Sequence, residues 1–311
     1  MRWFPHPLVL IGMMFWHLAN AWAYCRATTC DREGAPAECV STRVNDCSTM
    51  GVPIAWPSTC VSSSVSAYGS PRRNISPDAM RTIVSNAFQQ WTTAGCGDGG
   101  SPNFVVDMFP DVVCQDATGD SGFKPAGPNY NLWIFHDDSW PYTDTGGEAA
   151  IAMTKVLFDQ DTGEIWDADV ELNSYSVEFT TDPDVVNVDL QSVVQHESGH
   201  FLGLGHSQDP DATMYAILDP KTAETKKRVL KADDTDGICA VYPPGQLNSS
   251  CNPEPRHGFS PDCELLPTGC TLASGRSVKH KSWFGGLILG LALVVGAVRR
   301  RRICHRFLRK L

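Results

Sequence analysis

The sequence predicts an α+β fold, an α/β sandwich in which helices pack on a mixed, twisted sheet. Three observations predict it: an amphipathic helix early in the chain, a run of strand-like segments after it, and two further helices late in the chain. The chain has 311 residues, which is enough for one sizeable domain with appendages.

The early helix is predicted to begin at Ser76-Pro77-Asp78. Serine is a preferred N-cap, proline fits the first turn, and an acidic residue there complements the helix dipole. Apolar residues follow at helical spacing and indicate a face that packs on the sheet: Met80, Ile83, Val84, Ala87, Phe88 and Trp91.

The strand-like segments are rich in β-branched and aromatic residues, and Gly-, Pro- and Asp-containing turns separate them. They cover residues 60–68, 103–109, 131–135, 149–158 and 164–172. The turn at 159–163 ends in glycine and favours a hairpin between the last two segments.

Two late helices are expected at residues 190–202 and 232–241. In the second of these, Asp233 and Asp234 suit the first turn, and a Pro-Pro pair follows its end. The first carries the most specific chemical signal in the chain, which is described below.

Residues 1–23 have the pattern of a signal peptide. Arg2 provides a short basic region, an apolar stretch follows it, and Ala21-Trp22-Ala23 is a small-x-small cleavage site. We therefore expect export, with Tyr24 as the new N-terminus. A first core helix is the alternative, but the cleavage pattern favours the signal peptide.

Because an exported protein enters an oxidising compartment, the 12 cysteines are candidate disulfide partners. Ten of them lie before residue 264, and five of these crowd a Cys-rich N-terminal segment, residues 24–60. The sequence neighbours Cys96–Cys114 and Cys251–Cys263 are candidate disulfides, although spacing alone leaves the connectivity open. A zinc finger is not predicted, because no Cys-x₂-Cys pair occurs.

The charge of the chain is unevenly distributed. Residues 24–270 hold 14 Lys and Arg against 35 Asp and Glu, a formal charge of −21, whereas residues 271–311 hold 10 basic residues and no acidic ones. Because the acidic body would repel phosphates, a nucleic-acid binder is excluded.

Residues 196–206 carry the pattern HExxHxxGxxH. On a helix, positions i and i+4 share one face, so His196 and His200 can present their imidazoles to one metal ion. Gly203 lets the chain turn sharply, which brings His206 round as a third ligand. Three protein ligands leave one position open for water, which is typical of a catalytic zinc site.

Glu197 lies beside this pair of histidines and can reach a zinc-bound water without ligating the metal. Zinc lowers the pKa of such a water toward about 7, and Glu197 can take its proton as the water attacks a peptide carbonyl. Glu197 can then pass the proton to the leaving amine. Three histidines that are simply buried on a core helix are the alternative, and the length of the pattern argues against it.

This pattern resembles that of the metzincin zinc peptidases. Met214 lies eight residues after the last histidine of the motif, as in the metzincin Met-turn. Ser207, directly after the motif, and the segment 233–242 are similar to the matrixin branch. The resemblance covers about residues 56–243, and we place the catalytic domain at residues 61–245.

The resemblance implies one catalytic Zn²⁺, with His196, His200 and His206 as ligands, Glu197 as base and Met214 as the apolar floor under the metal. It also implies that the first strand of the predicted hairpin is an edge strand. An extended peptide substrate would pair along that edge by β-augmentation.

The sequence departs from animal matrixins in several places. A second, structural zinc is not expected, because the counterpart segments 152–155 and 167–170 contain no histidine, and His136 is expected to be a surface or loop residue rather than a ligand. No cysteine-switch motif occurs, and residues 24–60 are too short for the usual pro-domain, so latency is unexplained. Ala216 replaces the usual proline after Met-Tyr, so the sequence does not determine the character of the primary specificity pocket.

Four acidic residues in and beside the predicted hairpin offer carboxylates to a Ca²⁺ ion: Asp159, Asp161, Asp167 and Asp169. Carboxylate oxygens are the ligands that Ca²⁺ prefers in proteins. A solvated acidic hairpin is equally consistent with the sequence.

A Cys-containing linker, residues 246–270, leads to a C-terminal tail at 271–311. The tail holds an uncharged run, residues 283–298, that is slightly short for a membrane-spanning helix and precedes four arginines. The basic cluster places the C-terminus in the cytoplasm. The order of Cys270, spacer, apolar run and arginines resembles myxobacterial sorting signals, which implies that Cys270 is a processing or anchoring site. A permanent single-pass anchor is the alternative.

Together these features predict an exported, surface-tethered zinc endopeptidase that acts on extracellular proteins, at the cell surface, in the outer envelope or outside the cell. The expected partners are protein or peptide substrates and, through the tail, a membrane; the oligomeric state is open. The alternatives are a non-catalytic zinc-binding adhesin and a cell-wall amidase. The intact motif argues against the adhesin, and the lack of a recognisable peptidoglycan-binding module argues against the amidase.

Overall fold

The structure is a computed structural model, which describes residues 24–30, 39, 43–44, 47–48, 50–97, 99–114, 127–142, 150–185, 187–217, 225–245 and 251–265. The predicted signal peptide, the C-terminal tail and Cys270 lie outside these residues. Within the described ranges, no helix has the length and apolar character needed to cross a membrane.

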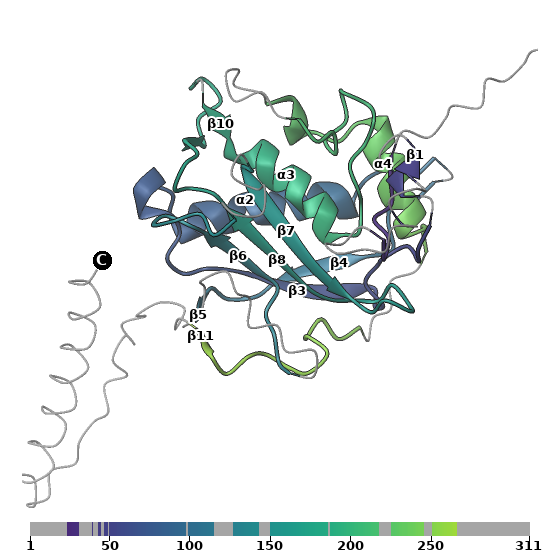
Figure 1. Ribbon diagram of the computed structural model, residues 1–311, viewed down its shortest axis with the longest axis horizontal. Coiled ribbons are helices and arrows are strands. Elements are labelled where there is room, and N and C mark those ends of the chain that lie inside the picture. The colour runs from purple at the N-terminus through teal and green to yellow at the C-terminus, as the bar shows by residue number, and fades with distance from the viewer. Residues whose placement is uncertain are drawn as a thin grey trace, which may run out of the picture. The chain divides into compact units, whose positions relative to one another are not determined.

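A five-stranded mixed sheet is the centre of the fold (Figure 1). Its strand order is β4-β3-β6-β8-β7, with three parallel pairings and one antiparallel pairing, between β7 and β8. The strands are β3 (Cys60–Val65), β4 (Val105–Met108), β6 (Leu132–Phe135), β7 (Ala152–Phe158) and β8 (Ile165–Leu172). The predicted hairpin is therefore confirmed, and β7 is an edge strand of the sheet.

Two helices, α2 (Pro77–Thr92) and α3 (Leu190–Phe201), cover one face of this sheet (Figure 1). Helix α2 begins as predicted, because the Ser76 hydroxyl accepts the backbone N–H of Ala79 at 3.1 Å and Pro77 stands in the first turn. A third helix, α4 (Ala232–Val241), has the predicted bounds. The α+β metzincin-like architecture predicted from the sequence is thus confirmed.

The main hydrophobic core lies between the helices and the sheet. Phe88 of α2 contacts Phe201 of α3 and Trp133 of β6, with ring centroids 4.9 and 5.8 Å away. The Trp91 side chain is fully buried, and its indole N–H donates to the Gln195 carbonyl at 2.9 Å, which joins the two helices. Truncating such a buried aromatic residue typically costs about 3–5 kcal/mol, so this packing fixes α3 on the sheet.

The opposite face of the sheet is covered by a smaller cluster. Strand β5 (Val112–Cys114) pairs antiparallel with β11 (Cys263–Leu265), and Cys114 stands opposite Cys263 in that register. The cluster contains Val112, Tyr130, Leu132 and Ile134, with Phe259 packed against it. Residues 251–265 therefore lie against the same domain as the sheet.

The disulfides correct the pairing that was expected from sequence proximity. Cys96 bonds to Cys239 and Cys114 to Cys263, rather than Cys96 to Cys114. Cys251 bonds to Cys60, rather than to Cys263. Cysteines far apart in sequence meet because the sheet and α4 bring their segments together, which spacing along the chain cannot indicate.

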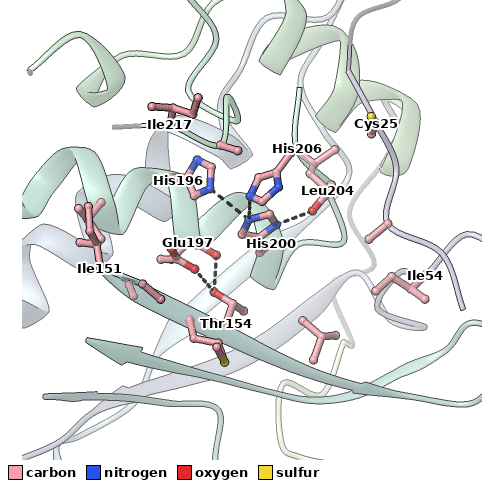
Figure 2. A pocket seen from close by; sticks show the side chains of 18 of the residues that line it. Cys25, Ile54, Ile151, Thr154, His196, Glu197, His200, Leu204, His206 and Ile217 are labelled. Carbon is pink, nitrogen blue, oxygen red and sulfur yellow. Dashed lines mark hydrogen bonds between the residues drawn. The ribbon is translucent and has the colours of Figure 1, made fainter. Parts of the chain in front are cut away.

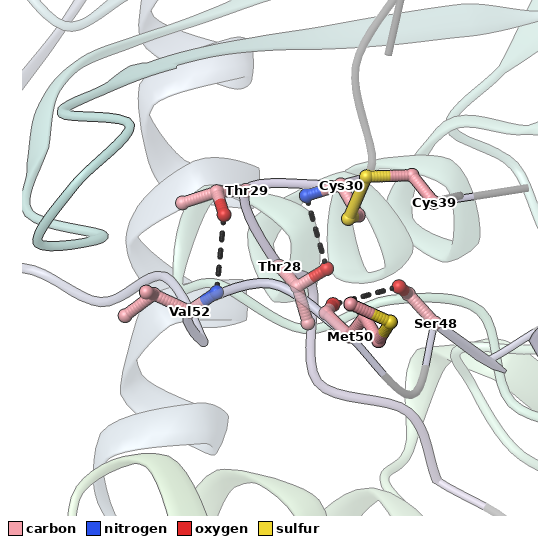
Figure 3. The surroundings of a disulfide bond; sticks show 7 residues. All are labelled: Thr28, Thr29, Cys30, Cys39, Ser48, Met50 and Val52. Atoms are coloured by element: carbon pink, nitrogen blue, oxygen red, sulfur yellow. Dashed lines mark hydrogen bonds between the residues drawn. A yellow bond between two sulfur atoms is a disulfide. The ribbon is translucent and has the colours of Figure 1, made fainter. Parts of the chain in front are cut away.

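The N-terminal segment packs against the end of α3. It contains the short strands β1 (Arg43–Val44) and β2 (Cys47–Ser48), and the disulfides Cys25–Cys47 and Cys30–Cys39 fasten it. Figure 3 shows hydrogen bonds beside the second disulfide, among them those from the Val52 N–H to the Thr29 hydroxyl and from the Cys30 N–H to the Thr28 hydroxyl. The Gly205 N–H donates to the Cys25 carbonyl at 2.9 Å, which attaches the segment to the residues that follow α3.

Four short elements complete the described chain. They are the 3₁₀ helices η1 (Pro71–Arg73) and η3 (Lys226–Arg228) and the parallel strand pair β9 (Phe179–Thr180) and β10 (Val188–Asp189). Helix η3 packs on α3 and brings a basic segment close to the candidate site.

Candidate metal centre

The start of helix α3 is fixed by Asp189. Its carboxylate accepts the Ser192 N–H at 2.7 Å, which caps the helix, and it also pairs with the Arg228 guanidinium of η3. The Asp189 side chain is 1% exposed, so this ion pair is largely removed from solvent. The first turn of the helix is therefore tied to the segment that follows the Met-turn.

The end of helix α3 is shaped by Gly203. Its φ of +92° is in the left-handed region, and a Cβ at this position would lie 2.6 Å from the Ile54 carbonyl oxygen. Only glycine fits here. The Trp56 indole donates to the Phe201 carbonyl at 2.9 Å and the Tyr242 hydroxyl to the Leu202 carbonyl at 3.1 Å, which satisfies carbonyls at the helix end.

The turn at Gly203 places His206 beside the two histidines of the helix. The Nε2 atom of His200 lies 3.1 Å from that of His196 and 3.2 Å from that of His206 (Figure 2). A tetrahedral zinc ion separates imidazole nitrogens by about 3.3 Å. Among the described residues these three form the one group of three or more metal-binding side chains, so the donor set fits a zinc ion.

Backbone carbonyls orient two of these rings. Nδ1 of His196 hydrogen-bonds to the Thr213 carbonyl at 2.7 Å, and Nδ1 of His200 to the Leu204 carbonyl at 2.8 Å. With Nδ1 as the donor, Nε2 carries the lone pair that a metal needs. Burial, with the charges of His200 and Lys227, holds the pKa of His196 well below its usual range, which favours the neutral imidazole.

Glu197 lies beside the histidine trio and contacts the edge strand. It is 7% exposed, and its Oε2 accepts the Thr154 hydroxyl of β7 at 2.5 Å (Figure 2). Burial raises the pKa of Glu197 to about 7, while the Thr154 hydrogen bond and the charge of Lys227 oppose this rise. No local sequence pattern indicates the contact between Thr154 and Glu197, because these residues are 43 positions apart.

Met214 lies under α3 in the predicted Met-turn. Its side chain is 2% exposed, and a Cβ on Gly199 would be 2.2 Å from the Met214 sulfur. The Asp234 carboxylate of α4 accepts the N–H groups of Thr213 and Met214 at 2.8 and 2.9 Å. Helix α4 therefore holds the turn against the histidine trio.

The histidines and Glu197 line a cleft of 870 Å³. Strand β7 contributes one wall through Ala152, Met153, Thr154, Val156 and Phe158. The N-terminal segment contributes Cys25, Cys47 and Ile54, and Figure 2 shows Thr154, Cys25 and Ile54 around the histidines. Ala216, Ile217 and Lys227 complete the lining beside the Met-turn. The sequence did not predict that the N-terminal segment and Lys227 would reach the cleft.

His136 lies in the loop directly after β6, as one part of the expectation had it, but it is not at the surface. Its side chain is 9% exposed and its Nε2 lies 2.7 Å from the Glu171 carboxylate, which also accepts the Tyr142 hydroxyl and pairs with Lys155 at 3.1 Å. These contacts hold the pKa of Glu171 below its usual range against the opposing effect of burial, which is the largest single influence. Lys155 of β7 and Glu171 of β8 therefore belong to an ion-paired cluster with His136.

The four acidic residues proposed for calcium do not gather within the described chain. The Asp159 carboxylate accepts the backbone N–H groups of Asp161 and Thr162, which closes the β7–β8 turn. Asp167 is buried on β8, and the Asp169 carboxylate accepts the Leu132 N–H. The structure supports no calcium site here, and the buried Asp167 does not fit a solvated hairpin either.

The fold and the histidine trio define a metzincin-like domain. Residues 133–243 match the family model described as Matrixin, and this match includes the whole site apart from the N-terminal segment. Residues 133–243 are thus similar to the matrixin family, as the motif and the Met-turn indicated.

Curated relatives agree with this assignment. The chain is 30% identical to Metalloendoproteinase 1-MMP of Arabidopsis thaliana over 228 residues, which are 72% of this chain and 51% of that protein. It is 32% identical to Metalloendoproteinase 1 of Glycine max over 167 residues, 53% of this chain and 46% of that protein. It is 28% identical to Matrix metalloproteinase-C of Caenorhabditis elegans over 200 residues, which are 63% of this chain and 30% of that protein. The chain spans about half the length of the two plant relatives.

Proposed function

We propose that this protein is an exported zinc endopeptidase that hydrolyses peptide bonds of extracellular proteins. The observation that carries the proposal is the convergence of three histidine Nε2 atoms and the Glu197 carboxylate in one cleft beside an edge strand. The similarity to the matrixin family and the names of the relatives support the same chemistry.

Each residue of the site has a role in this proposal. His196, His200 and His206 hold the ion through Nε2, and Met214 packs beneath them. When bound, zinc supplies Lewis-acid chemistry that acidifies water and polarises a peptide carbonyl. Glu197 accepts a proton from the attacking water at its carboxylate and delivers it to the leaving nitrogen. The Thr154 hydroxyl orients the carboxylate, since it donates to Oε2 at 2.5 Å.

Strand β7 is proposed to bind the substrate backbone. As an edge strand it pairs only with β8 in the described sheet, so its other side can hydrogen-bond to an extended peptide. Thr154 belongs to this strand and contacts Glu197, which would bring a paired peptide to the base. Endopeptidase activity follows if the peptide crosses the cleft in this way.

Export and tethering are proposed from the sequence at the two ends of the chain. The cleavage pattern after Ala23 supports secretion, and the five disulfides of the described residues are consistent with an oxidising compartment. The apolar run and arginines of the tail support attachment to the cell surface, with Cys270 as the processing site.

The test is cleavage of casein or gelatin by the purified, oxidised, zinc-loaded protein. We expect cleavage that 1,10-phenanthroline abolishes and added zinc restores, because the metal is held only by three neutral imidazoles. Absence of cleavage by a folded, zinc-loaded protein would contradict the proposal and favour the zinc-binding adhesin. Release of peptidoglycan fragments, without cleavage of either protein, would favour the cell-wall amidase.

A further inference from the structure

The loop at residues 203–206 connects helix α3 to the third histidine of the site. Two of the ligands belong to the helix, whereas His206 follows the Gly203 turn and is exposed to solvent. The Leu204 carbonyl of the same loop hydrogen-bonds to Nδ1 of His200 at 2.8 Å. The loop therefore places one ligand directly and orients a second, so contacts that hold the loop act on the metal site.

The N-terminal segment holds this loop through backbone pairing. Two hydrogen bonds join residues 25–27 to the loop, from the Ala27 N–H to the Gly203 carbonyl at 3.0 Å and from the Gly205 N–H to the Cys25 carbonyl at 2.9 Å. They flank an antiparallel bridge between the two stretches. The whole part of the loop that precedes the third histidine is thus paired with the N-terminal segment.

The same N-terminal stretch is paired on its other side with residues 52–54. The Ile54 N–H donates to the Ala27 carbonyl and the Thr29 N–H to the Val52 carbonyl, both at 2.9 Å. The stretch therefore lies between two neighbouring pieces of backbone, as the middle strand of a small sheet does. It cannot move relative to the loop without breaking hydrogen bonds on one side.

The Cys25–Cys47 disulfide lies against the end of the loop that is nearest the third ligand. A Cβ at Gly205 would lie 3.2 Å from the Cβ of Cys25, so the disulfide and the residue before His206 are in close contact. Cys25 also lines the cleft beside the histidines, as does Cys47 (Figure 2). The second disulfide of the segment is not among the described residues that line the cleft.

The other side of His206 is held by the Met-turn. The Ser207 N–H donates to the Met214 carbonyl at 2.8 Å. Both neighbours of the ligand are therefore anchored, Ser207 by the Met-turn and Gly205 by the N-terminal segment. The match to the matrixin family begins at residue 133, so the second anchor comes from a part of the chain outside that match.

We propose that residues 25–27, fastened by the Cys25–Cys47 disulfide, are a positioning element of the zinc site, and that the active protein keeps the N-terminal segment for this reason. Ligands that are held in place before the ion binds lose less freedom on binding. Groups behind the ligands typically change metal affinity by about 10–100-fold. This inference rests on the proposed function, because it concerns the zinc ion that the histidine trio would hold.

A purely structural role for the disulfide makes a different prediction. If it only restricts the unfolded chain, its loss lowers the melting temperature but leaves the zinc affinity of the folded protein unchanged. If it positions His206, its loss weakens zinc binding and alters the coordination of the bound metal. The readouts are therefore the zinc dissociation constant and the visible spectrum of Co²⁺ bound in place of zinc, since that spectrum reports coordination geometry.

The test compares two double variants of the purified, oxidised protein. Cys25→Ser/Cys47→Ser removes the disulfide beside the loop, and Cys30→Ser/Cys39→Ser removes the other disulfide of the same segment. Zinc dissociation constants are measured by competition with a chromophoric chelator, at a temperature well below the unfolding of each protein.

A second pair of variants keeps both disulfides. Gly205→Ala presses a methyl group against Cys25, whereas Gly97→Ala is the matched control, because a Cβ at Gly97 meets nothing within 4 Å. We expect zinc to bind about fivefold or more weakly to Gly205→Ala than to Gly97→Ala, because overpacking displaces the residue before the ligand. This pair decides the question if Cys25→Ser/Cys47→Ser does not fold, and equal affinities would then overturn the inference.

For the double variants, we expect zinc to bind about tenfold or more weakly to Cys25→Ser/Cys47→Ser than to the wild type, with an altered Co²⁺ spectrum. The control, Cys30→Ser/Cys39→Ser, should stay within about twofold of the wild type and keep its spectrum. Wild-type zinc affinity in a folded Cys25→Ser/Cys47→Ser, or an equal loss in both double variants, would overturn the inference. A folded wild type that binds no zinc would instead contradict the proposed function.

Discussion

Gly199 lies between the first two histidines of the motif, and its missing side chain makes room for the Met-turn. A Cβ there would be 2.2 Å from the Met214 sulfur and 3.0 Å from the Trp91 ring. Both neighbours are buried, so neither can move aside freely. The position explains why helix α3 tolerates a helix-weakening residue next to its ligands.

Gly199→Ala should destabilise the protein by about 1–3 kcal/mol through overpacking, even though alanine is the better helix former. The measurement is urea unfolding of the zinc-free protein. Gly95→Ala is the matched control, because a Cβ at Gly95 meets nothing within 4 Å. Equal unfolding free energies for the two variants would show that Met214 does not pack against α3 as described.

Asp167 is a buried carboxylate whose Oδ1 has no hydrogen-bond partner among the residues that the structure describes. Burial and the charge of Asp169 raise its pKa well above 3.8, and burial raises the pKa of Asp169 to about 7. Because the folded state holds these protons more tightly than the unfolded state, the pair lowers the unfolding free energy as the pH rises from about 4 to 7.

Asp167→Asn should therefore stabilise the protein at pH 8 and change little near pH 4. Unfolding free energies of wild type and variant across this range provide the measurement. Asp161→Asn, at an exposed position of the β7–β8 turn, is the control for loss of one negative charge. A variant that is less stable than the wild type at pH 8 would contradict the assignment of a buried, unfavourable charge.

At the scale of the elements, the helices were the most predictable part of the fold. The bounds of α4 were predicted as observed and those of α3 to within one residue, and α2 begins where it was predicted to begin. Caps, proline positions and apolar spacing are local signals, so the sequence carries them directly. The histidine motif was predictable for the same reason, because the i and i+4 spacing and the glycine turn are both local.

Other contacts of the site could not be predicted, because they join elements that are distant in sequence. Thr154 meets Glu197 only when β7 lies beside α3, and Lys227 enters the cleft only when η3 packs on that helix. The disulfides depend likewise on the register of β5 with β11 and on the placement of α4. From the sequence, a lysine in a short basic segment is expected to be exposed to solvent. Only the tertiary structure shows that Lys227 is buried.

Helix α3 gives a prediction at this scale. Asp189→Ala removes both a helix cap and a buried ion pair, so it should cost about 3–5 kcal/mol, because the Arg228 charge loses its partner. Ser76→Ala removes the equivalent cap from α2 without an ion pair and should cost about 1 kcal/mol. Urea unfolding measures both values. A similar cost for the two variants would indicate that the Arg228 contact contributes little.

At the scale of the whole molecule, disulfides join distant parts of the chain. Cys96–Cys239 closes a separation of 143 residues and Cys60–Cys251 one of 191, whereas Cys30–Cys39 closes only 9. A longer closed loop removes more conformational entropy from the unfolded chain. The long-range bonds therefore contribute more to global stability than the local ones do.

Replacing Cys96 and Cys239 by serine should lower the unfolding free energy by about 5 kcal/mol, against about 3 kcal/mol for the same change at Cys30 and Cys39. Mass spectrometry of the unreduced digest verifies each pairing before unfolding is measured. The reverse order of the two costs would contradict a role for α4 as a cross-linked part of the domain.

The central claim is that the histidine trio holds a zinc ion and that Glu197 acts on water beside it. One measurement tests it most directly: zinc content and peptide hydrolysis of the wild type and of Glu197→Gln, determined on the same preparations. We predict about one zinc per chain in both proteins, and a loss of hydrolysis of about 10³-fold or more in the variant. Full zinc occupancy with undiminished hydrolysis in Glu197→Gln would contradict the account.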